Sequence, residues 1–342
     1  MKRVTIQDIA DKVGVTKGLV SRALRGKYEV SEKMREEITH AAVAMNYDFS
    51  KLRAKNKTRS KVLLVMTSKM LLEKDYWQPI IRVITATFEE KHVNLEYQIY
   101  DEETLGAEDV EKIKNVNAAG YVFMHNNPDV LVKTAENTGR PVVVIDPKNN
   151  LQGRHLQVKY SNFNSCYEIT SLLIRGGHKN FLFYGATDES SSFIEREQGF
   201  SASISDNAAS GVKGYKLLFK NAAGNYADNA GFVEILHKHP EISAVVCAND
   251  IIAINAMKSI TKMGKKVPDD YAVAGFDNIV DSGYSNIDLT TVNVPREDLG
   301  REVAKYLVNH INKKHIKYSQ IIIDCETVVR GSTGNINHTD IL

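Results

Sequence analysis

Polar side chains recur directly after short apolar runs along most of the chain. In a parallel sheet the carboxyl ends of the strands share one edge, and ligands bind beyond that edge. Side chains in these positions could therefore form one ring of hydrogen-bonding groups, which suits a polyhydroxylated ligand. Three aromatic residues could cover the face of a sugar. The polar candidates are Ser68, His125, Asn126, Asp146, Asn249, Asp250 and Asp277, and the aromatic ones are Tyr76, Trp77 and Tyr226.

Two of these candidates have a structural alternative. Asp250 directly precedes the apolar residues 251–253, and an acidic residue in that position often caps a helix. Trp77 could equally belong to a hydrophobic core. We therefore expect Asp250 to be a helix cap and leave Trp77 open between pocket and core.

Strand-like and helix-like segments alternate after residue 61. This alternation is typical of parallel sheets covered by helices. About 280 residues is large for one such sheet, and the apolar runs form two series that meet near Tyr160, which indicates two lobes. The runs span residues 62–66, 95–100, 121–124 and 142–145 in the first series, and residues 181–184, 215–219, 244–247 and 271–274 in the second.

The first 48 residues predict three short helices. Thr5 is a good N-cap with Asp8 three residues later, and Gly14 can take the positive φ that ends this helix. Thr16 caps a second helix, so only a very short turn joins the two. Ser31 caps a third helix whose apolar residues repeat at helical spacing. Three short helices around one small core make a helix-turn-helix module.

Basic residues are concentrated in the same part of the chain. Residues 1–61 contain 15 Lys and Arg against 7 Asp and Glu, a net charge of +8. The whole chain has 44 basic and 42 acidic residues, so the remainder keeps 29 against 35, a net charge of −6. Six basic residues with no acid among them alternate from Lys51 to Lys61. This asymmetry indicates a polyanionic partner for the N-terminal module.

The second helix of a helix-turn-helix module lies in the major groove of DNA, and its N-terminal residues face the base edges. Here Arg22 could form two hydrogen bonds with guanine, and Lys17 could donate to guanine or phosphate. Ser21 and Thr16 suit phosphate oxygens, whereas Gly18 offers only its backbone. A helix pair of this size could also dock another protein, but the charge and the capping pattern favour DNA.

These residues resemble the lactose and galactose repressor (LacI/GalR) family of transcription regulators. The head of that family is matched without a gap through Tyr47, and the core signatures follow in order to about Thr333. The matching head motifs are Thr5–Ala10, Gly14–Thr16, Val20–Leu24, Val30–Ser31 and Asn46–Tyr47, and the core motifs are Gly177–Lys179, Arg196–Phe200, Ala248–Asp250, Gly275–Asp277, Leu289–Val292 and Arg330–Thr333.

The resemblance implies an all-α helix-turn-helix head and an α/β core of two lobes like periplasmic binding proteins, with parallel sheets flanked by helices. The head would span residues 1–48 and a hinge helix, which enters the minor groove, residues 49–61. The effector-binding and dimerisation core would span residues 62–335. Its lobes would comprise approximately residues 62–160 with 292–320, and residues 161–291 with 321–335.

The resemblance also implies roles for individual residues. The base-reading positions would be those of Lys17, Gly18 and Arg22, and Arg196 could hold two adjacent effector oxygens with its planar fork of donors. The expected DNA-binding residues are Thr5, Thr16, Lys17, Gly18, Ser21, Arg22, Ser31, Lys55 and Lys57. The expected effector-binding residues are Asp146, Arg196, Asn249 and Asp277, with Ser68, Trp77 and Tyr226 lining the pocket.

The sequence departs from the family pattern at two places. A leucine of the family's hinge wedges between base pairs, but Asn56 stands in that position here. Intercalation needs an apolar side chain, so either Leu52 takes this role in a shifted helix or the hinge binds through its cations, and we favour the cations. Ser161 stands where the family usually has Asp, next to the predicted crossover between the lobes.

Other functional classes lack their motifs in this sequence. It contains no Gly-x-Ser-x-Gly, no His-x-x-x-His, no Gly-x-Gly-x-x-Gly opening a helix and no phosphate loop. We therefore expect no enzyme, and no catalytic residue, metal or cofactor. The three cysteines are too widely spaced for a disulfide framework or a zinc site, so reduced thiols are expected.

No apolar stretch approaches the roughly 20 residues of a membrane span. The N-terminus turns polar and acidic too soon for a secretory signal, so we expect a cytoplasmic protein without a membrane partner. A transport binding protein would share the two lobes but would need export and would lack the basic head.

These observations together predict a sequence-specific DNA-binding transcription regulator, and more specifically a repressor of carbohydrate-utilisation genes. It would bind a near-palindromic operator as a homodimer, because one such head contacts too few base pairs. A sugar or sugar phosphate bound between the lobes would control operator affinity. The alternatives are a purine or another metabolite as effector, or a sugar-cleft enzyme or binding protein.

Overall fold

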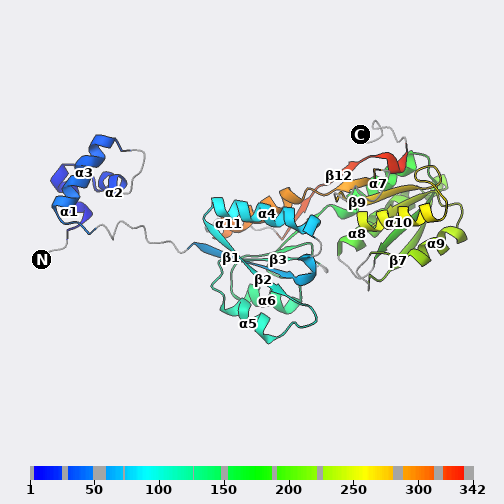
Figure 1. The fold of residues 1–342 in the computed structure, drawn as a ribbon, viewed down its shortest axis with the longest axis horizontal. Helices are drawn as coiled ribbons and strands as arrows, with labels where there is room; N and C mark the ends of the chain where they lie inside the picture. The colour runs from blue at the N-terminus through cyan, green and yellow to red at the C-terminus, as the bar shows by residue number, and fades with distance from the viewer. Residues whose placement is uncertain are drawn as a thin grey trace. The chain divides into compact units, whose positions relative to one another are not determined.

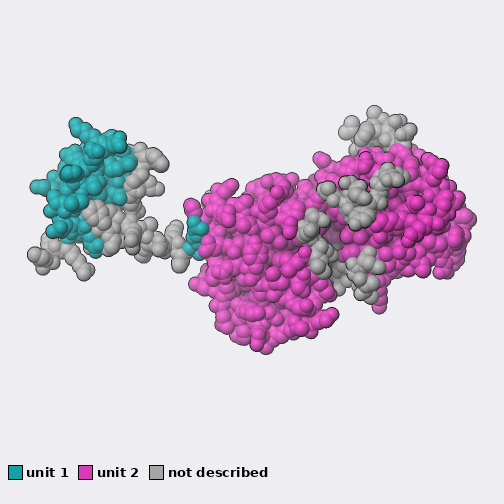
Figure 2. Space-filling model, viewed as in Figure 1, with its two compact units in different colours: residues 1–59 teal, residues 60–342 magenta. Residues whose placement is uncertain are grey.

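A computed structural model of the chain describes ten stretches of it (Figure 1). The chain divides into two compact units, residues 1–59 and 60–342 (Figure 2). The described stretches are residues 4–24, 30–48, 59–71, 74–125, 127–147, 153–186, 191–221, 226–279, 288–311 and 319–334.

The first unit contains the three expected helices, α1 (Ile6–Val13), α2 (Lys17–Leu24) and α3 (Glu32–Ala44). Thr5 and Asp8 form a reciprocal capping box, and Gly14 ends α1 with a φ of +73°. Such a φ favours glycine because a Cβ would strain it. Ser31 precedes α3 but forms no side-chain capping hydrogen bond, which corrects its expected role as a cap.

The core of this unit is small and continuous. Its buried residues come from all three helices and from the chain beside them, and partly buried apolar residues surround them. Burying one face of each short helix compensates for the cost of ordering helices that are too short to be stable alone. The buried residues are Ile9, Ala10, Val20, Ala23, Val30, Ile38, Ala42 and Tyr47.

The second unit contains two six-stranded sheets. The first has the order β11-β5-β4-β3-β1-β2, and all its neighbouring strands are parallel. Helices α4 (Lys74–Glu90) and α11 (Arg296–Ile311) lie side by side on one face, and α5 (Ala107–Asn115) and α6 (Asp129–Asn137) lie on the other (Figure 1). The strands are β1 (Ser60–Thr67), β2 (Val93–Tyr100), β3 (Gly120–Met124), β4 (Val142–Ile145), β5 (Leu156–Tyr160) and β11 (Gln320–Ile323).

The second sheet has the order β12-β10-β9-β8-β6-β7, and only β12 is antiparallel to its neighbour. Its helices are α7 (Asn162–Arg175), α8 (Ser191–Asp206), α9 (Asn229–Lys238) and α10 (Asp250–Lys262). The strands are β6 (Asn180–Ala186), β7 (Lys213–Phe219), β8 (Ala244–Cys247), β9 (Ala272–Asp277), β10 (Thr290–Asn293) and β12 (Glu326–Val328).

The chain passes three times between the two sheets, after β5, after β10 and after β11. Two of the expected lobe boundaries need correction. β10 pairs with β9 through Asn293, so the second crossing follows residue 293 rather than 291. β11 pairs with β5 from Gln320 through Ile323, so residues 321–323 stay with the first sheet. The expected hinge is also shorter, because Ser60 and Lys61 already belong to β1.

Among the described residues, no helix is both long and apolar enough to cross a membrane.

Candidate functional site

Helix α2 presents polar residues on the face opposite its core contacts. Val20 and Ala23 are buried, whereas Lys17, Gly18 and Arg22 are exposed. A Cβ added to Gly18 would meet no atom within 4 Å. This face therefore offers two cations and an accessible stretch of backbone, which are the groups that read base edges and phosphates.

The other expected DNA-binding residues differ in their surroundings. Thr16 is exposed and its Oγ1 accepts a hydrogen bond of 3.3 Å from the Leu19 amide, so it caps α2 as expected. Thr5 caps α1, Ser21 is half-buried and Ser31 is exposed. Lys55 and Lys57, with Leu52 and Asn56 of the hinge, lie outside the described residues. The DNA contacts of all these residues remain predictions.

In the second unit, strained backbone marks the carboxyl ends of three strands. His125 follows β3, Asp146 follows β4 and Asp277 ends β9, with φ values of +57°, +45° and +105°. Non-glycine residues rarely adopt such angles, which cost free energy and persist where the surrounding structure enforces them. Two of the three are expected effector-binding residues.

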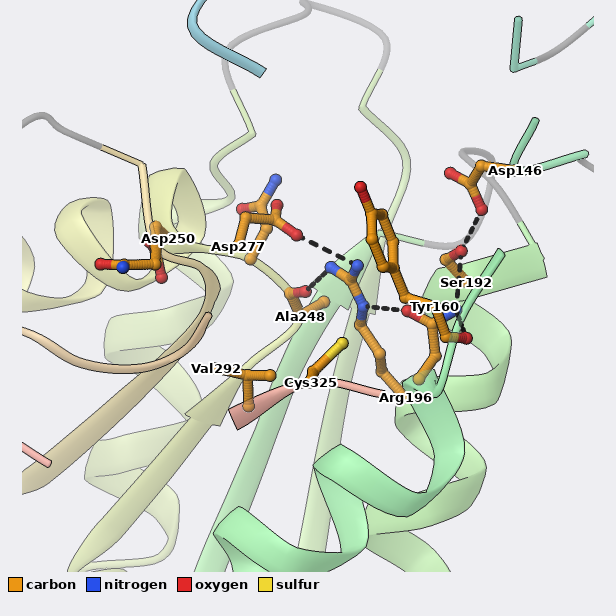
Figure 3. A network of polar contacts seen from close by, with 12 residues as sticks. Asp146, Tyr160, Ser192, Arg196, Ala248, Asp250, Asp277, Val292 and Cys325 are labelled. Atoms are coloured by element: carbon orange, nitrogen blue, oxygen red, sulfur yellow. Dashed lines mark hydrogen bonds and ion pairs between the residues drawn. The ribbon is translucent and has the colours of Figure 1, made fainter. Parts of the chain in front are cut away.

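Arg196, on α8, is the centre of a buried polar network that we call the Arg196 cluster (Figure 3). Its Nε donates to Asn162 Oδ1 at 3.0 Å and one Nη donates to the Ala248 carbonyl at 2.7 Å. The other Nη lies 3.1 Å from Asp277 Oδ1. The guanidinium carbon lies 3.7 Å from the centroid of the Phe276 ring. The cluster consists of Asp146, Tyr160, Asn162, Ser192, Arg196 and Asp277, all at most 9% exposed.

Asp146 joins the first sheet to helix α8 of the second. Its Oδ1 accepts a short hydrogen bond from the Ser192 hydroxyl, and its Oδ2 lies 3.4 Å from His125 Nδ1. Burial, the largest single influence, raises the pKa of Asp146, but His125, Ser192 and the charge of Arg196 together outweigh it and hold the pKa below its usual value. Asp146 is therefore an ionised acceptor near neutral pH.

The pKa of Asp277 is shifted in the opposite direction from that of Asp146. Burial raises its pKa to about 6 although the charges of Arg196 and Arg296 oppose the rise. The contact of its Oδ1 with Arg196 is a close ion pair, but it lacks the alignment of a hydrogen bond. The Asp277 carbonyl accepts from Arg296 at 2.6 Å. One carboxylate oxygen therefore retains the capacity to accept a hydrogen bond.

The sequence predicted Asp250 as the cap of α10, and this prediction is wrong. Asn249, and not Asp250, caps α10, because its Oδ1 accepts from the Ile252 amide at 2.9 Å. The carboxylate of Asp250 instead accepts from the Thr291 hydroxyl and the Ile279 amide. Burial and the charge of Asp277 raise the pKa of Asp250 to about 7. The side-chain carbonyl oxygen of Asn249 is thus occupied by the cap, and its predicted contact with the effector stays a prediction.

The three residues expected to line the pocket approach the cluster unequally. The Trp77 ring is buried and lies 5.5 Å from the His125 ring, so it touches both core and site. The Tyr226 ring stacks at 6.3 Å on Phe193, whose ring lies 5.5 Å from the Arg196 guanidinium. Ser68, in a 3-10 turn (Ser68–Leu71), points to Asp101 after β2, with a hydrogen bond of 3.4 Å.

Two family models match the chain. The model of bacterial regulatory proteins of the lacI family matches residues 5–48, and that of the periplasmic binding protein-like domain matches residues 170–333. The HTH-type transcriptional regulator GntR of Escherichia coli (strain K12) is 27% identical over 323 residues, which cover 92% of this chain and 94% of GntR. CelR of Thermobifida fusca is 25% identical over 348 residues, 97% of this chain and 98% of CelR. The chain belongs to the lacI family.

Solved structures agree with this lacI-family fold. A complex of the regulator CelR with cellobiose has a TM-score of 0.67 at 23% identity and covers 96% of this chain and 100% of its own. A lac repressor dimer bound to operator and the anti-inducer ONPF has a TM-score of 0.68 at 21% identity, with coverages of 97% and 100%. The predicted family and fold class are confirmed, and the lacI-family protein is a transcription regulator rather than an enzyme.

The polar network around Arg196 also contains residues that the sequence did not indicate. Ser192 precedes Arg196 by four residues on α8, so helical spacing could have suggested that they share a face. Tyr160 ends β5, a strand that the apolar runs did not reveal. Arg296 begins α11 and donates to the carbonyls of Asp277 and Asn278. No local signal marks Arg296, because its partners lie 18 and 19 residues earlier in the sequence.

Further contacts connect α8 of the regulator with the first sheet. The Ser191 hydroxyl donates to the Pro147 carbonyl at 2.6 Å, and Lys159 on β5 forms a buried ion pair with Glu195. Asn162 also donates to Glu195, at 3.1 Å. Within the described stretches, no group of three or more His, Cys, Asp or Glu residues could hold a metal ion.

Proposed function

We propose that this regulator represses carbohydrate-utilisation genes and that a sugar bound at the Arg196 cluster controls its affinity for operator DNA. The main observation behind the proposal is that residues of both lobes form the Arg196 cluster. Asp146 belongs to the first sheet, whereas Ser192 and Arg196 lie on a helix of the second. A ligand that binds these residues in one arrangement of the lobes and not in another biases the protein between two states.

The chemistry of the cluster supports a polyhydroxylated effector. Carboxylates and amides at strand ends can bind several hydroxyls. The Trp77 ring lies beside the His125 ring, and the Tyr226 ring stacks on Phe193, which lies near Arg196. CelR has been solved with cellobiose, and the lac repressor with operator and the anti-inducer ONPF. The sequence also left a purine open, but no contact within the described cluster specifically favours one.

A homodimer on a near-palindromic operator follows from the size of the first unit. One short recognition helix contacts only a few base pairs, and two-fold pairing places a second copy on the adjacent half-site. We infer that the protein acts in the cytoplasm, where the chromosome is accessible. Sedimentation of the chain should therefore give a dimer, and a stable tetramer would overturn this part of the proposal.

The test of DNA binding is recovery and sequencing of genomic fragments bound by the full chain at two salt concentrations. We expect enrichment of one short two-fold-symmetric site, whose neighbouring genes identify the regulated pathway. Arg22→Ala should weaken binding to that site by about 1–3 kcal/mol and reduce the preference for one base pair within it. Lys238→Ala, which removes an exposed charge on α9, is the control and should change neither. Salt-sensitive binding without sequence preference would contradict the proposal.

The hinge provides a separate test. If it binds through its cations, Lys55→Ala or Lys57→Ala should lower the slope of operator affinity against salt concentration by about one. An unchanged slope would assign the hinge contact to another residue, such as Leu52. The effector site is tested by Asp277→Ala, which should abolish the response to the effector and leave operator affinity intact.

A further inference from the structure

Two buried polar atoms in the Arg196 cluster lack a hydrogen-bond partner among the described residues. They are the hydroxyl of Tyr160 and Oδ1 of Asp277. Tyr160 is 1% exposed and Asp277 is 9% exposed. Figure 3 shows the Tyr160 hydroxyl and the Asp277 carboxylate at the same end of the Arg196 side chain. Asp277 Oδ1 keeps its ion pair with Arg196 at 3.1 Å, so the Tyr160 hydroxyl is the unsatisfied group of the two. A buried hydroxyl without a partner destabilises a fold, and beside a carboxylate that can accept further hydrogen bonds it indicates a position built for a ligand hydroxyl.

The two atoms are complementary in hydrogen bonding. Burial raises the pKa of Tyr160 well above its usual value, so its hydroxyl stays protonated and can donate. The ionised carboxylate of Asp277 can only accept. A single alcohol hydroxyl satisfies both, because its oxygen accepts from Tyr160 while its hydrogen is donated to Asp277. A phosphate oxygen could accept from Tyr160, but its charge would face the carboxylate at close range.

The cations near these atoms are already engaged with protein groups. Arg196 contacts Asn162, the Ala248 carbonyl and Asp277, and Arg296 donates to the carbonyls of Asp277 and Asn278. Lys159 pairs with Glu195. Facing them are the carboxylates of Asp146, Asp250 and Asp277. In the described part of the chain, therefore, each of these three cations already contacts a protein acceptor. A phosphate group buried beside them would lack a cation of its own, and burying an anion without one is unfavourable.

We propose that the effector is an uncharged sugar, that one of its hydroxyls bridges Tyr160 and Asp277, and that the site rejects the phosphorylated form of the same sugar. This inference rests on the proposed effector function of the Arg196 cluster. The sequence predicted a sugar or a sugar phosphate as effector, and the inference restricts this to the uncharged sugar. It also assigns Tyr160 as a specificity-determining residue.

The test is calorimetric titration of the full chain with matched pairs of ligands. Suitable pairs are glucose and glucose 6-phosphate, ribose and ribose 5-phosphate, and gluconate as an acid beside glucose. We expect at least one neutral member to bind, and its phosphorylated or acidic counterpart to bind at least tenfold more weakly. Equal or tighter binding of a charged member overturns the proposal, and so does the absence of binding by every neutral sugar.

Tyr160→Phe sharpens the test because it removes only the hydroxyl. The affinity for the neutral sugar should fall about three- to tenfold, which corresponds to one hydrogen bond. Tyr121→Phe is the matched control, since Tyr121 is equally buried on β3 of the same sheet but donates to the Ile113 carbonyl, away from the cluster. Unchanged affinity in Tyr160→Phe would remove Tyr160 from the site.

Operator binding by the same preparations distinguishes an error in the charge of the effector from an error in the regulatory function. If the chain binds a symmetric operator but a charged ligand is preferred, the charge class is wrong and the regulatory function stands. If neutral sugars bind without changing operator affinity, the charge class stands and the coupling of the Arg196 cluster to DNA binding is wrong.

Discussion

Lys17 and Arg22 are exposed on α2, whereas Arg196 and Asp277 are buried and contact each other. In the first unit a core of eight buried residues holds three helices, and the polar residues expected to contact DNA lie outside it. In the Arg196 cluster the residues expected to contact the effector also hold two sheets together. Binding and stability are therefore separable on α2 and coupled in the cluster.

This difference has a physical cause. DNA is a large polyanion that an exposed surface can reach, so cations on α2 need no burial. A small uncharged ligand must be surrounded to be recognised, and surrounding it places polar groups in a region of low dielectric where each needs a partner. In the structure the cluster residues supply those partners to one another.

The largest expected effect is that of Arg196→Ala on stability. Removing the guanidinium leaves Asp277 as a buried charge without its cation, and Asn162 and the Ala248 carbonyl lose their donor. Breaking a buried pair in this way costs about 3–5 kcal/mol of unfolding free energy. Arg22→Ala, at an exposed position, should change it by less than about 0.5 kcal/mol. Urea unfolding of the two variants measures this difference in stability. Equal unfolding midpoints would mean that the Arg196 cluster contributes no more to stability than the exposed face of α2.

The second prediction is a pH dependence of effector affinity. Because the pKa of Asp277 is raised to about 6, its carboxylate is ionised at pH 7.5 and increasingly protonated below pH 6. A hydroxyl donates to the ionised form, so binding must expel the proton at low pH, and affinity should fall by up to about tenfold per pH unit below pH 6. The charged groups that act on Asp277 are Arg196, Arg296, Asp146 and Asp250.

Asp277→Asn is the control for this pH dependence, because an amide has no proton to lose in that range. The variant should bind the neutral sugar more weakly at pH 7.5 and with little change down to pH 5. Operator binding in the absence of effector should show no corresponding step near pH 6. A wild-type affinity that is flat from pH 7.5 to pH 5 would exclude Asp277 as an acceptor.

The third prediction concerns the capping of α1. Thr5→Ala removes the Oγ1 atom that pairs with Asp8, and the loss of such a cap costs about 1 kcal/mol. Thermal unfolding of the full chain should show this loss only in the transition of the first unit. Effector titration serves as the readout of the second unit and should be unchanged. A shift in the transition of the second unit would mean that the two units unfold together.

The smallest expected effect is that of Lys17→Ala on the salt dependence of DNA binding. If Lys17 contacts a phosphate, the slope of log affinity against log salt concentration should fall by about one, equally for all DNA sequences. If it contacts a guanine, the loss should depend on the base at one position. Filter binding to the selected operator and to one mismatched operator separates the two cases.

The three helices of the first unit were predicted from local pattern alone. Thr5, Asp8 and Gly14 act within one short segment, and the turn that they define is the one observed. The eight strands expected from apolar runs also form. Six of them are buried along nearly their whole length, which requires apolar residues, whereas the edge strands β2 and β7 are partly exposed. β5 was missed because Gln157 and Lys159 interrupt its pattern, although both are buried. Lys159 is tolerated there only because Glu195 of the other lobe pairs with it.

The roles within the Arg196 cluster were decided by tertiary structure. Asp146, Arg196 and Asp277 were expected from the family resemblance, but nothing local distinguishes an effector contact from a partner of another residue. Asn249 and Asp250 are adjacent, and which of them caps α10 depends on Thr291 and the Ile279 amide, far along the chain. Tyr160 and Ser192 become relevant only where two strand ends and a helix meet. The sequence by itself therefore determined the class of protein, the three helices of the first unit and eight of the described strands, since these depend on neighbours within one turn or strand. The partners of each buried polar group, and so the chemistry of the effector site, were set by long-range packing.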